Sequence, residues 1–499
     1  MSEHPDRARR WLIGASGAAL VSRAFPLTAS YAQNAAPPLP AGDANPEDSK
    51  VSPATDKLAD YIAGTLDREL PANIVAATKL HVLDTFAAMV SGSRLKPGAL
   101  AARYVDSLGG KPQATVIGTG LVTSSVLAAF SNAMSAHADE TDDTDPIGPV
   151  HLGSGAVSAA LAAAELTGRS GGDMLRAVTL AYDIGARIVS ALGVDETSKR
   201  YSPSCIATSF VAASAAAALL RLDRQQVRHT ISYAAQQASG IGYWTRDPDH
   251  IEKAFDFAGM GARNGVMAAT MVAMGFTGVE DPFIGGDNVY ASLAEKPAPE
   301  KLIAGLGTDY AVLDTTIKKW TVGTPLQSVL DSVAALIEDP GVRADNIKHI
   351  KVEVMTASLR IVDNATSPDL SLQHLVAMMI VDRGATFASV HDAARMSDPK
   401  VLAVRKLVEL AGSEELQKAK PPRQAIVRID LADGRSLSHR TTIVRGTAGN
   451  PVSAQEVEAK ALDLMTPVLG AGRAKDLIAA VQSLDTFGAV SGLRPLLQA

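Results

Sequence analysis

The sequence has one cysteine, Cys205, and aromatic residues make up only 4% of its 499 residues. A single thiol forms no intramolecular disulfide, so the folded state depends on its hydrophobic core. With so few aromatic rings, Ala, Leu, Val and Met must fill that core, which favours closely packed helices over a β-sandwich. The length predicts two or more domains.

Blocks of like charge are also absent. The formal net charge is −6, and both signs are mixed along the chain. Because a nucleic-acid-binding protein needs a basic patch or stripe, we expect no nucleic-acid partner.

The N-terminus has no apolar run long enough for a stable membrane span, which needs about 20 residues. Arg9-Arg10 precede a weakly apolar stretch, residues 11–22, and a small-residue motif follows at residues 30–32. This order predicts a twin-arginine-type signal peptide over residues 1–32 and a periplasmic protein. Residues 1–32 hold four arginines and two acids, so cleavage would remove a charge of +2 and leave −8.

The remaining chain divides by composition. Residues 33–56 are rich in Pro, Ala, Asp and Ser, which predicts a flexible linker. In residues 57–280 apolar residues recur at intervals of three and four, and residues 450–499 are similar, which predicts helices. Residues 281–449 mix helical and strand-like patterns. The predicted fold class is therefore mainly α, with a large all-helical domain and a smaller inserted α+β domain.

Two stretches within residues 281–449 alternate like strands, residues 349–362 and 425–446. The second contains Asp433-Gly434, a strong hairpin signal. A helical segment is predicted before the two stretches, around residues 327–337, and another between them, around residues 372–381.

The stretch SAHADETDDTDPIGPVHLGSGAV, residues 135–157, places five carboxylates between Asp139 and Asp145 and a histidine, His151, before small residues. Asp139, Glu140 and Asp143 have the spacing of a magnesium-binding motif in all-helical prenyl-diphosphate enzymes. However, we find no second acidic cluster. A solvated turn and a proton-transfer site are the other interpretations.

Ionisable residues recur in apolar, glycine-rich surroundings at three later places. Lys253 precedes a helix rich in small residues, Lys318 and Lys319 precede a helix near Pro325, and His374 begins an apolar helix. Each alone fits a surface lysine or a core histidine. Together they favour a functional site, because buried charge is costly unless it is paired or used.

In this order, AHADETDDT with HLGSGAV, KAFDFAGMGARNGVMAA with GFTG, IKKWTVGTPLQSVLD and PDLSLQHLVAMMIVD resemble the MmgE/PrpD family. That family includes 2-methylcitrate dehydratase, cis-aconitate decarboxylase and iminodisuccinate epimerase. The resemblance runs from residue 57 to the C-terminus. It implies a helical domain made from both ends of the chain, an inserted lid domain, a site in the cleft between them, a homodimer, and no metal or organic cofactor.

The resemblance also implies the site residues. The acidic motif, the following histidine and the first site lysine supply the expected catalytic residues, which are Glu140, Asp142, Asp143, His151 and Lys253. The expected substrate-binding residues are Lys318, Lys319, His374, which stands where tyrosine is usual, and His137 beside the acidic motif.

The chain departs from the family pattern at two places. A family histidine is absent near Cys205, and HLGSGAV lacks the usual proline after His151. His81 and His391 lack a comparable context and are expected to be structural.

The chemistry common to these relatives is proton transfer at a carbon next to a carboxylate, with loss of water or carbon dioxide where a group leaves. Ammonium groups would stabilise the developing negative charge, and His151 would exchange the proton. We therefore expect an exported lyase, either a dehydratase or a decarboxylase, or an epimerase acting on a small di- or tricarboxylic acid. The alternatives are a non-catalytic periplasmic polycarboxylate-binding protein and a magnesium-dependent prenyl-synthase-like enzyme.

Overall fold

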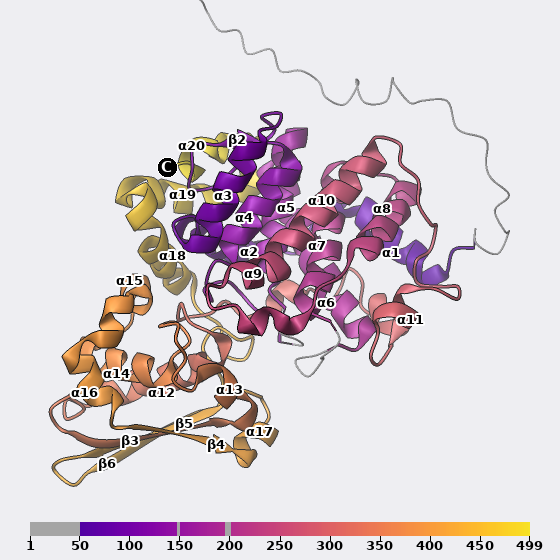
Figure 1. Cartoon of the computed structure of the whole chain (residues 1–499). Coiled ribbons are helices and arrows are strands. Elements are labelled where there is room, and N and C mark those ends of the chain that lie inside the picture. Colours follow the sequence, from indigo (N-terminus) through magenta and orange to yellow (C-terminus); the bar gives the residue numbers. More distant parts are fainter. Residues whose placement is uncertain (1–49, 147–149, 195–200) are drawn as a thin grey trace, which may run out of the picture. The chain divides into compact units, whose positions relative to one another are not determined.

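The computed structural model describes residues 50–146, 150–194 and 201–499 (Figure 1). The predicted signal peptide, residues 1–32, and most of the predicted linker lie outside these residues. Helix α1 (Pro53–Ala63) begins inside the linker range, because the Ser52 hydroxyl accepts a hydrogen bond from the Thr55 amide and a proline occupies the first turn. The linker prediction is therefore wrong from Pro53 onward.

The first half of the chain is almost entirely helical, as its periodicity predicts. After α1 the elements are α2 (Ala72–Gly92), α3 (Lys96–Leu108), β1 (Ala114–Thr115), β2 (Val122–Thr123), α4 (Ser125–Ala136), α5 (Leu152–Thr167), α6 (Gly171–Leu192), α7 (Pro203–Leu219), α8 (Arg224–Gln237), α9 (Ile251–Ala254), α10 (Met260–Ala273) and α11 (Val289–Leu293). Every residue of α7 is buried. A Cβ atom at Gly265 of α10 would lie 2.3 Å from the Ala213 amide, so these two helices need glycine and alanine to pack closely.

The C-terminal helices return to this helical core. They are α18 (Ala454–Leu469), α19 (Ala471–Gln482) and α20 (Arg494–Leu497), and α18 packs on α2 (Figure 1). One hydrophobic cluster joins residues 58–317 with residues 457–497. We call these residues the helical part.

A second hydrophobic cluster joins residues 322–431, which we call the α+β part. Its sheet has the strand order β4 (Val408–Ser413), β3 (Ile347–Met355), β5 (Ala425–Leu431), β6 (Ser436–Thr441). Its helices are α12 (Gln327–Ile337), α13 (Leu359–Val362), α14 (Leu372–Asp382), α15 (Phe387–His391), α16 (Pro399–Arg405) and α17 (Glu414–Lys418). Helices α12 and α14 cover one face of the sheet (Figure 1).

The strand predictions are partly right. The hairpin of β5 and β6 turns at Asp433-Gly434, where Gly434 has a φ of +90° that favours glycine. The strand predicted over residues 349–362 ends at Met355, because its pairing with the parallel strand β4 ends there and α13 follows. Overall, the predicted fold class, mainly α with a small α+β portion, is confirmed.

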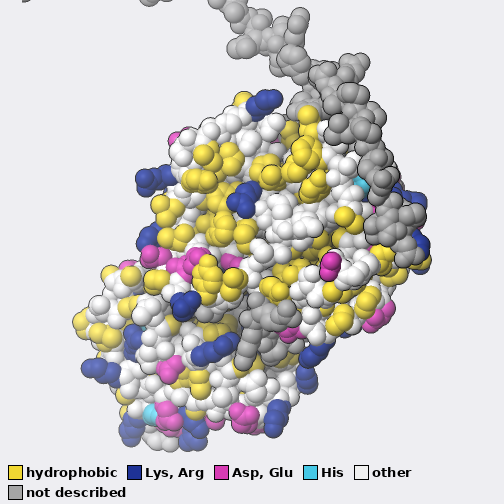
Figure 2. Space-filling view, turned by 45° about the vertical axis from the view of Figure 1, so that its right-hand side comes forward, with side chains coloured by type: hydrophobic (Ala, Val, Ile, Leu, Met, Phe, Trp, Pro, Cys, Tyr) yellow, Lys and Arg dark blue, Asp and Glu magenta, His cyan; other side chains and the backbone are white. Residues whose placement is uncertain are grey.

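Helix α2 is the one helix among the described residues that is long and apolar enough to cross a membrane. However, 72% of its apolar window is buried inside the protein, which is typical of a core helix. Figure 2 shows hydrophobic side chains in patches between scattered charges of both signs.

Candidate active site

The acidic stretch forms a buried loop, residues 137–146, which we call the acidic loop. Helix α4 ends at Ala136, so His137 and Glu140 lie in a loop and not on a helix. The five carboxylates from Asp139 to Asp145 are all buried. The solvated-turn interpretation is therefore wrong as well. Adjacent buried carboxylates repel one another unless each has its own partner, and four of the five have partners described below.

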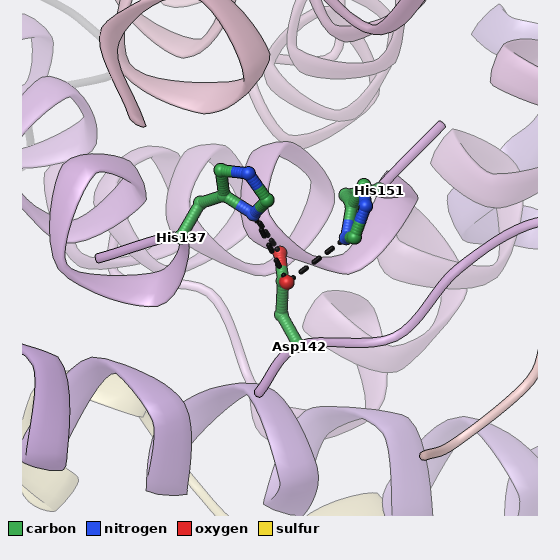
Figure 3. A group of neighbouring side chains, drawn as sticks. All are labelled: His137, Asp142 and His151. Carbon is green, nitrogen blue, oxygen red and sulfur yellow. Dashed lines mark hydrogen bonds and ion pairs between the residues drawn. The ribbon is translucent and has the colours of Figure 1, made fainter. Parts of the chain in front are cut away.

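Asp142 lies between two imidazole rings (Figure 3). Its carboxylate accepts hydrogen bonds from His137 Nδ1 at 3.0 Å and from His151 Nδ1 at 2.9 Å. Since a carboxylate only accepts, both histidines carry a proton on Nδ1, and a neutral ring then has a lone pair on Nε2. This arrangement fixes the tautomer of a histidine that acts as a general base.

Burial and neighbouring charges set the protonation states of His151 and Asp142. Burial lowers the pKa of His151 to about 4, although the charge of Asp142 opposes the effect. Burial raises the pKa of Asp142, but the two histidines outweigh it and leave the pKa well below its usual range. At neutral pH the cluster therefore holds an ionised Asp142 and a neutral His151 able to accept a proton.

Glu140 faces two lysines from distant segments. Lys253 of α9 donates to its carboxylate, and Lys318 donates to its backbone carbonyl at 2.6 Å with its Nζ 4.0 Å from the carboxylate. Burial raises the pKa of Glu140, but these ammonium charges outweigh it and hold the pKa well below its usual range. The segment carrying Lys318 reaches the loop because Thr316 and Thr144 exchange backbone hydrogen bonds.

Asp143 fixes the start of helix α5. It accepts hydrogen bonds from His81 Nδ1 at 2.7 Å, from the Tyr182 hydroxyl and from the Gly153 amide at 3.0 Å. His81 Nε2 faces the Val312 carbonyl at 3.0 Å. These bonds hold Asp143 between α2, α6 and the start of α5.

Asp139 links the acidic loop to the α+β part. His391 at the end of α15 approaches its carboxylate with a nitrogen-to-oxygen distance of 2.9 Å. Burial lowers the pKa of His391, but hydrogen bonding to Asp139 and the charges of Asp139 and Asp369 outweigh it and raise the pKa to about 9. At neutral pH the pair is therefore ionised.

A further ion pair ties the C-terminal return to the same loop. Lys460 of α18 lies 2.6 Å from buried Asp84 of α2 and donates to the Thr141 carbonyl at 3.0 Å. The acidic loop is thus held from α2, α15, α18 and the segment before α12.

Lys253 stands beside a break in helical geometry. Residues Phe255–Gly259 between α9 and α10 form a π-helical turn, a feature that often marks functional sites. The turn places Phe257 in a stack on His137, with ring centroids 4.8 Å apart, and under Lys253 Nζ at 5.1 Å. The lysine therefore combines an ion pair with cation–π contacts.

Two predicted substrate-binding residues lie elsewhere. The ammonium of Lys319 lies over the Trp320 ring at 4.6 Å and lines a cavity of about 520 Å³ together with His439 and Arg440. His374 is buried in the α+β part, where burial and the charges of Arg405 and Arg395 lower its pKa to about 4. In the described residues neither contacts the acidic loop.

Sequence reasoning missed several members of this cluster. His81 and His391, expected to be structural without a role at the site, are bonded to Asp143 and Asp139. His250 lies with Nδ1 3.9 Å from the Glu140 carboxylate. Its position three residues before Lys253 was the one feature of the sequence that could have placed His250 at the site. The pairs that involve His81 and His391 gave no local signal, because their partners are far away in the sequence.

The segment near Cys205, where the family pattern led us to expect a histidine, carries a hydroxyl paired with a carboxylate. The Ser202 hydroxyl donates to Asp256 of the π-helical turn, beside buried Cys205. Burial raises the pKa of Asp256 to about 7, although the hydrogen bond from Ser202 opposes the effect.

Metal binding has one geometric candidate in the described part of the chain. His137, Asp142 and His151 each offer one ligand atom, and these atoms lie within 4.8 Å of one another. Nitrogen-rich ligand sets of this kind suit zinc better than magnesium. Asp139, Glu140 and Asp143, the proposed magnesium motif, instead face His391, Lys253 and His81 respectively, so the described residues do not form a shared magnesium site.

Comparison with known proteins agrees with this arrangement. Residues 56–302 match the MmgE/PrpD N-terminal domain, and residues 320–486 match the MmgE/PrpD C-terminal domain. The chain is 22% identical over 488 residues to the cis-aconitate decarboxylase-like protein oryM of Aspergillus oryzae, which covers 91% of this chain and 98% of that protein. It is 24% identical over 468 residues to cis-aconitate decarboxylase of Homo sapiens, which covers 89% of this chain and 94% of that protein. With both family domains matched in order along most of its length, the chain belongs to the MmgE/PrpD family.

Proposed function

We propose that this protein is a lyase that acts on a small di- or tricarboxylic acid by proton transfer at a carbon next to a carboxylate. One observation carries the proposal: a neutral histidine fixed by an ionised aspartate shares a buried cluster with two lysines from distant segments. The family and the names of the two relatives support the same class of reaction.

Each residue has a defined task in this scheme. His151, with its proton on Nδ1 facing Asp142, removes the substrate proton through Nε2 and becomes an imidazolium that Asp142 stabilises. Negative charge then develops on the adjacent carboxylate. Lys318 and Lys253 stabilise it more strongly in this buried setting than they could in water.

Lys318 also helps to keep the base neutral. The charge of Lys318 is one of the causes that lower the pKa of His151, and burial lowers the pKa of Lys318 itself. The group that stabilises the developing carbanion therefore also helps to free the histidine for proton abstraction.

The identity of the leaving group separates three reactions. In a dehydration, hydroxide leaves after proton abstraction and takes the proton back from the imidazolium of His151 as water. In a decarboxylation, the bond to the carboxyl group breaks first, carbon dioxide leaves, and the electron pair that stays on the carbon takes a proton from solvent relayed through His151. In an epimerisation, a proton is delivered to the face opposite the one that lost it. We favour decarboxylation or dehydration, since both relatives are named for cis-aconitate decarboxylation.

The cellular setting and assembly are part of the proposal. The twin-arginine pattern before residue 32 supports export to the periplasm, and N-terminal sequencing of the mature protein tests it. We propose a homodimer that works without a metal or organic cofactor. Exposed apolar side chains such as Tyr104 and Leu108 of α3 are available for self-association, and light scattering measures the assembly.

The reaction itself is tested by incubating purified protein in D₂O with cis-aconitate, 2-methylcitrate and related acids, with and without a chelator. Proton NMR distinguishes loss of a carboxyl group from loss of water and detects solvent deuterium at the reacting carbon. We expect turnover that survives the chelator. Absence of both turnover and deuterium exchange with every acid would refute the lyase proposal.

A polycarboxylate-binding protein without catalysis is the second candidate. The observation that favours it is the absence of a histidine from the sequence near Cys205, where the Ser202 hydroxyl donates to Asp256. In that case polycarboxylates would raise the melting temperature without turnover, and His151→Ala would leave the rise unchanged.

A further inference from the structure

Three ring nitrogen atoms beside the acidic loop are buried and lack a hydrogen-bond partner in the described chain. They are Trp244 Nε1, His250 Nε2 and His137 Nε2. Buried polar atoms in folded proteins are nearly all hydrogen-bonded, so each exception needs a reason. Three such unpartnered atoms in one cluster indicate a site where a ligand supplies the missing hydrogen-bond partners.

The three rings belong to the cluster around Lys253. Its ammonium lies 5.3 Å from the centroid of the Trp244 ring and 5.1 Å from that of Phe257. Trp244 meets Phe257 edge to face at 4.6 Å. The rings of His250 and His137 have centroids 5.3 Å apart. The segment before α9 therefore brings two additional nitrogen atoms to the site.

The chemistry of these nitrogens selects the ligand. An indole N–H only donates, so the partner of Trp244 must be an acceptor. With a proton on Nε2, His250 donates from that buried, unpartnered nitrogen as well. His137 differs, because its proton is on Nδ1 facing Asp142 and its Nε2 is an acceptor.

Neutral donors are needed here because the ammonium groups already have anionic partners. Lys253 pairs with the Glu140 carboxylate, which Lys318 also approaches. A substrate with several carboxylates brings more negative charge than these two lysines can balance alone. Ring N–H groups bind a carboxylate without adding a charge that must itself be buried.

We infer that Trp244 and His250 form a carboxylate subsite, in which their ring N–H groups hold a substrate carboxylate remote from the carbon that loses its proton. The inference depends on the proposed function only for the class of ligand. A remote carboxylate is bound equally in the ground state and the transition state. Loss of the subsite therefore raises KM and leaves kcat unchanged.

Trp244→Phe tests the inference, because it removes the N–H and keeps an aromatic ring. The probe is tricarballylate, a saturated tricarboxylate, and its binding to the full chain is measured by calorimetry. We expect Kd to rise about ten- to a hundredfold, the usual effect of losing a hydrogen bond to a charged group. The melting temperature of the free protein should fall only by the packing lost between indole and phenyl, because the N–H itself has no partner there.

His250 provides a matched pair of variants. His250→Gln keeps an N–H donor near the position of Nε2 and should bind tricarballylate almost normally, whereas His250→Phe should weaken binding like Trp244→Phe. Tyr243→Phe, which alters an exposed neighbour, is the control. Unchanged affinity in Trp244→Phe, or a fall in its melting temperature that accounts for weaker binding, would overturn the inference.

The test also separates this inference from the proposed function. If the wild-type protein binds tricarballylate through Trp244 but turns over no acid, the lyase proposal fails and the subsite stands. If the wild-type protein turns over an acid and Trp244→Phe keeps its KM, the subsite fails alone.

Discussion

Replacing His391 by Gln should destabilise the protein in a pH-dependent way. The histidine ends α15 in the α+β part and forms an ion pair with Asp139 in the acidic loop. Gln keeps a hydrogen-bonding side chain of similar length but cannot carry the charge. The carboxylate of Asp139 would keep its hydrogen bonds from Thr141 but lose its positively charged partner.

The magnitude follows from linkage. The pKa of His391 rises from 6.5 to about 9 in the folded protein, and one pKa unit corresponds to about 1.4 kcal/mol, so the pair stabilises the fold by about 3 kcal/mol. Because the folded pKa is the higher one, this contribution is complete below about pH 6.5 and is lost as the pH rises through about 9.

Urea unfolding of both proteins at about pH 6 and about pH 10 checks the prediction. We expect His391→Gln to lower the free energy of unfolding by about 3 kcal/mol at the lower pH and by under about 1 kcal/mol at the higher pH. His349→Gln is the control, because the His349 side chain is 42% exposed and its ion pair with Glu409 should contribute under about 1 kcal/mol. An equal loss at both pH values would show that His391 acts through packing, and the linkage reasoning would be refuted.

Three further predictions concern the same cluster. Asp143→Asn should lower the free energy of unfolding by about 3 kcal/mol in urea, because it removes the buried negative charge that accepts hydrogen bonds from His81 and Tyr182, whereas the exposed Asp345→Asn should change it by under about 0.5 kcal/mol. The kcat/KM for a substrate acid should be level near neutral pH and fall tenfold per unit below about pH 4, where His151 gains a proton; a fall that begins near pH 6.5 would contradict the lowered pKa. Lys318→Met should reduce kcat/KM about 10²- to 10³-fold. It should also move the fall of kcat/KM at acid pH to a higher pH, because one of the charges that lower the pKa of His151 is removed. If the fall stayed at the same pH, Lys318 would not influence the protonation of His151.

The sequence predicted those features that depend on neighbouring residues. Periodicity placed α12 and α14 within one residue of their observed bounds, and Asp433-Gly434 placed the β5–β6 hairpin. The acidic motif also placed Glu140, Asp142 and Asp143 at one site with His151, without choosing which of them faces the histidine. In each case the interacting groups lie within one helix, one turn or one short loop.

The sequence could not resolve which of two adjacent lysines serves the site. Outside helices, successive side chains point to opposite sides, so Lys318 and Lys319 face different surroundings. The backbone bonds between Thr144 and Thr316 set which of them faces the acidic loop. Those bonds join segments far apart in the chain, and local patterns contain no information about them.

The same limit applies to the partners of the acidic loop, and it has a consequence for how the site forms. Asp139 is paired from α15, Glu140 from α9 and the segment before α12, and Asp143 from α2 and α6. Without these partners the adjacent carboxylates would be buried unpaired, at a cost that a loop alone cannot offset. The acidic loop can therefore take this conformation only when both parts of the chain have folded around it, so changes far from His151 that loosen any one pair should alter its environment as well.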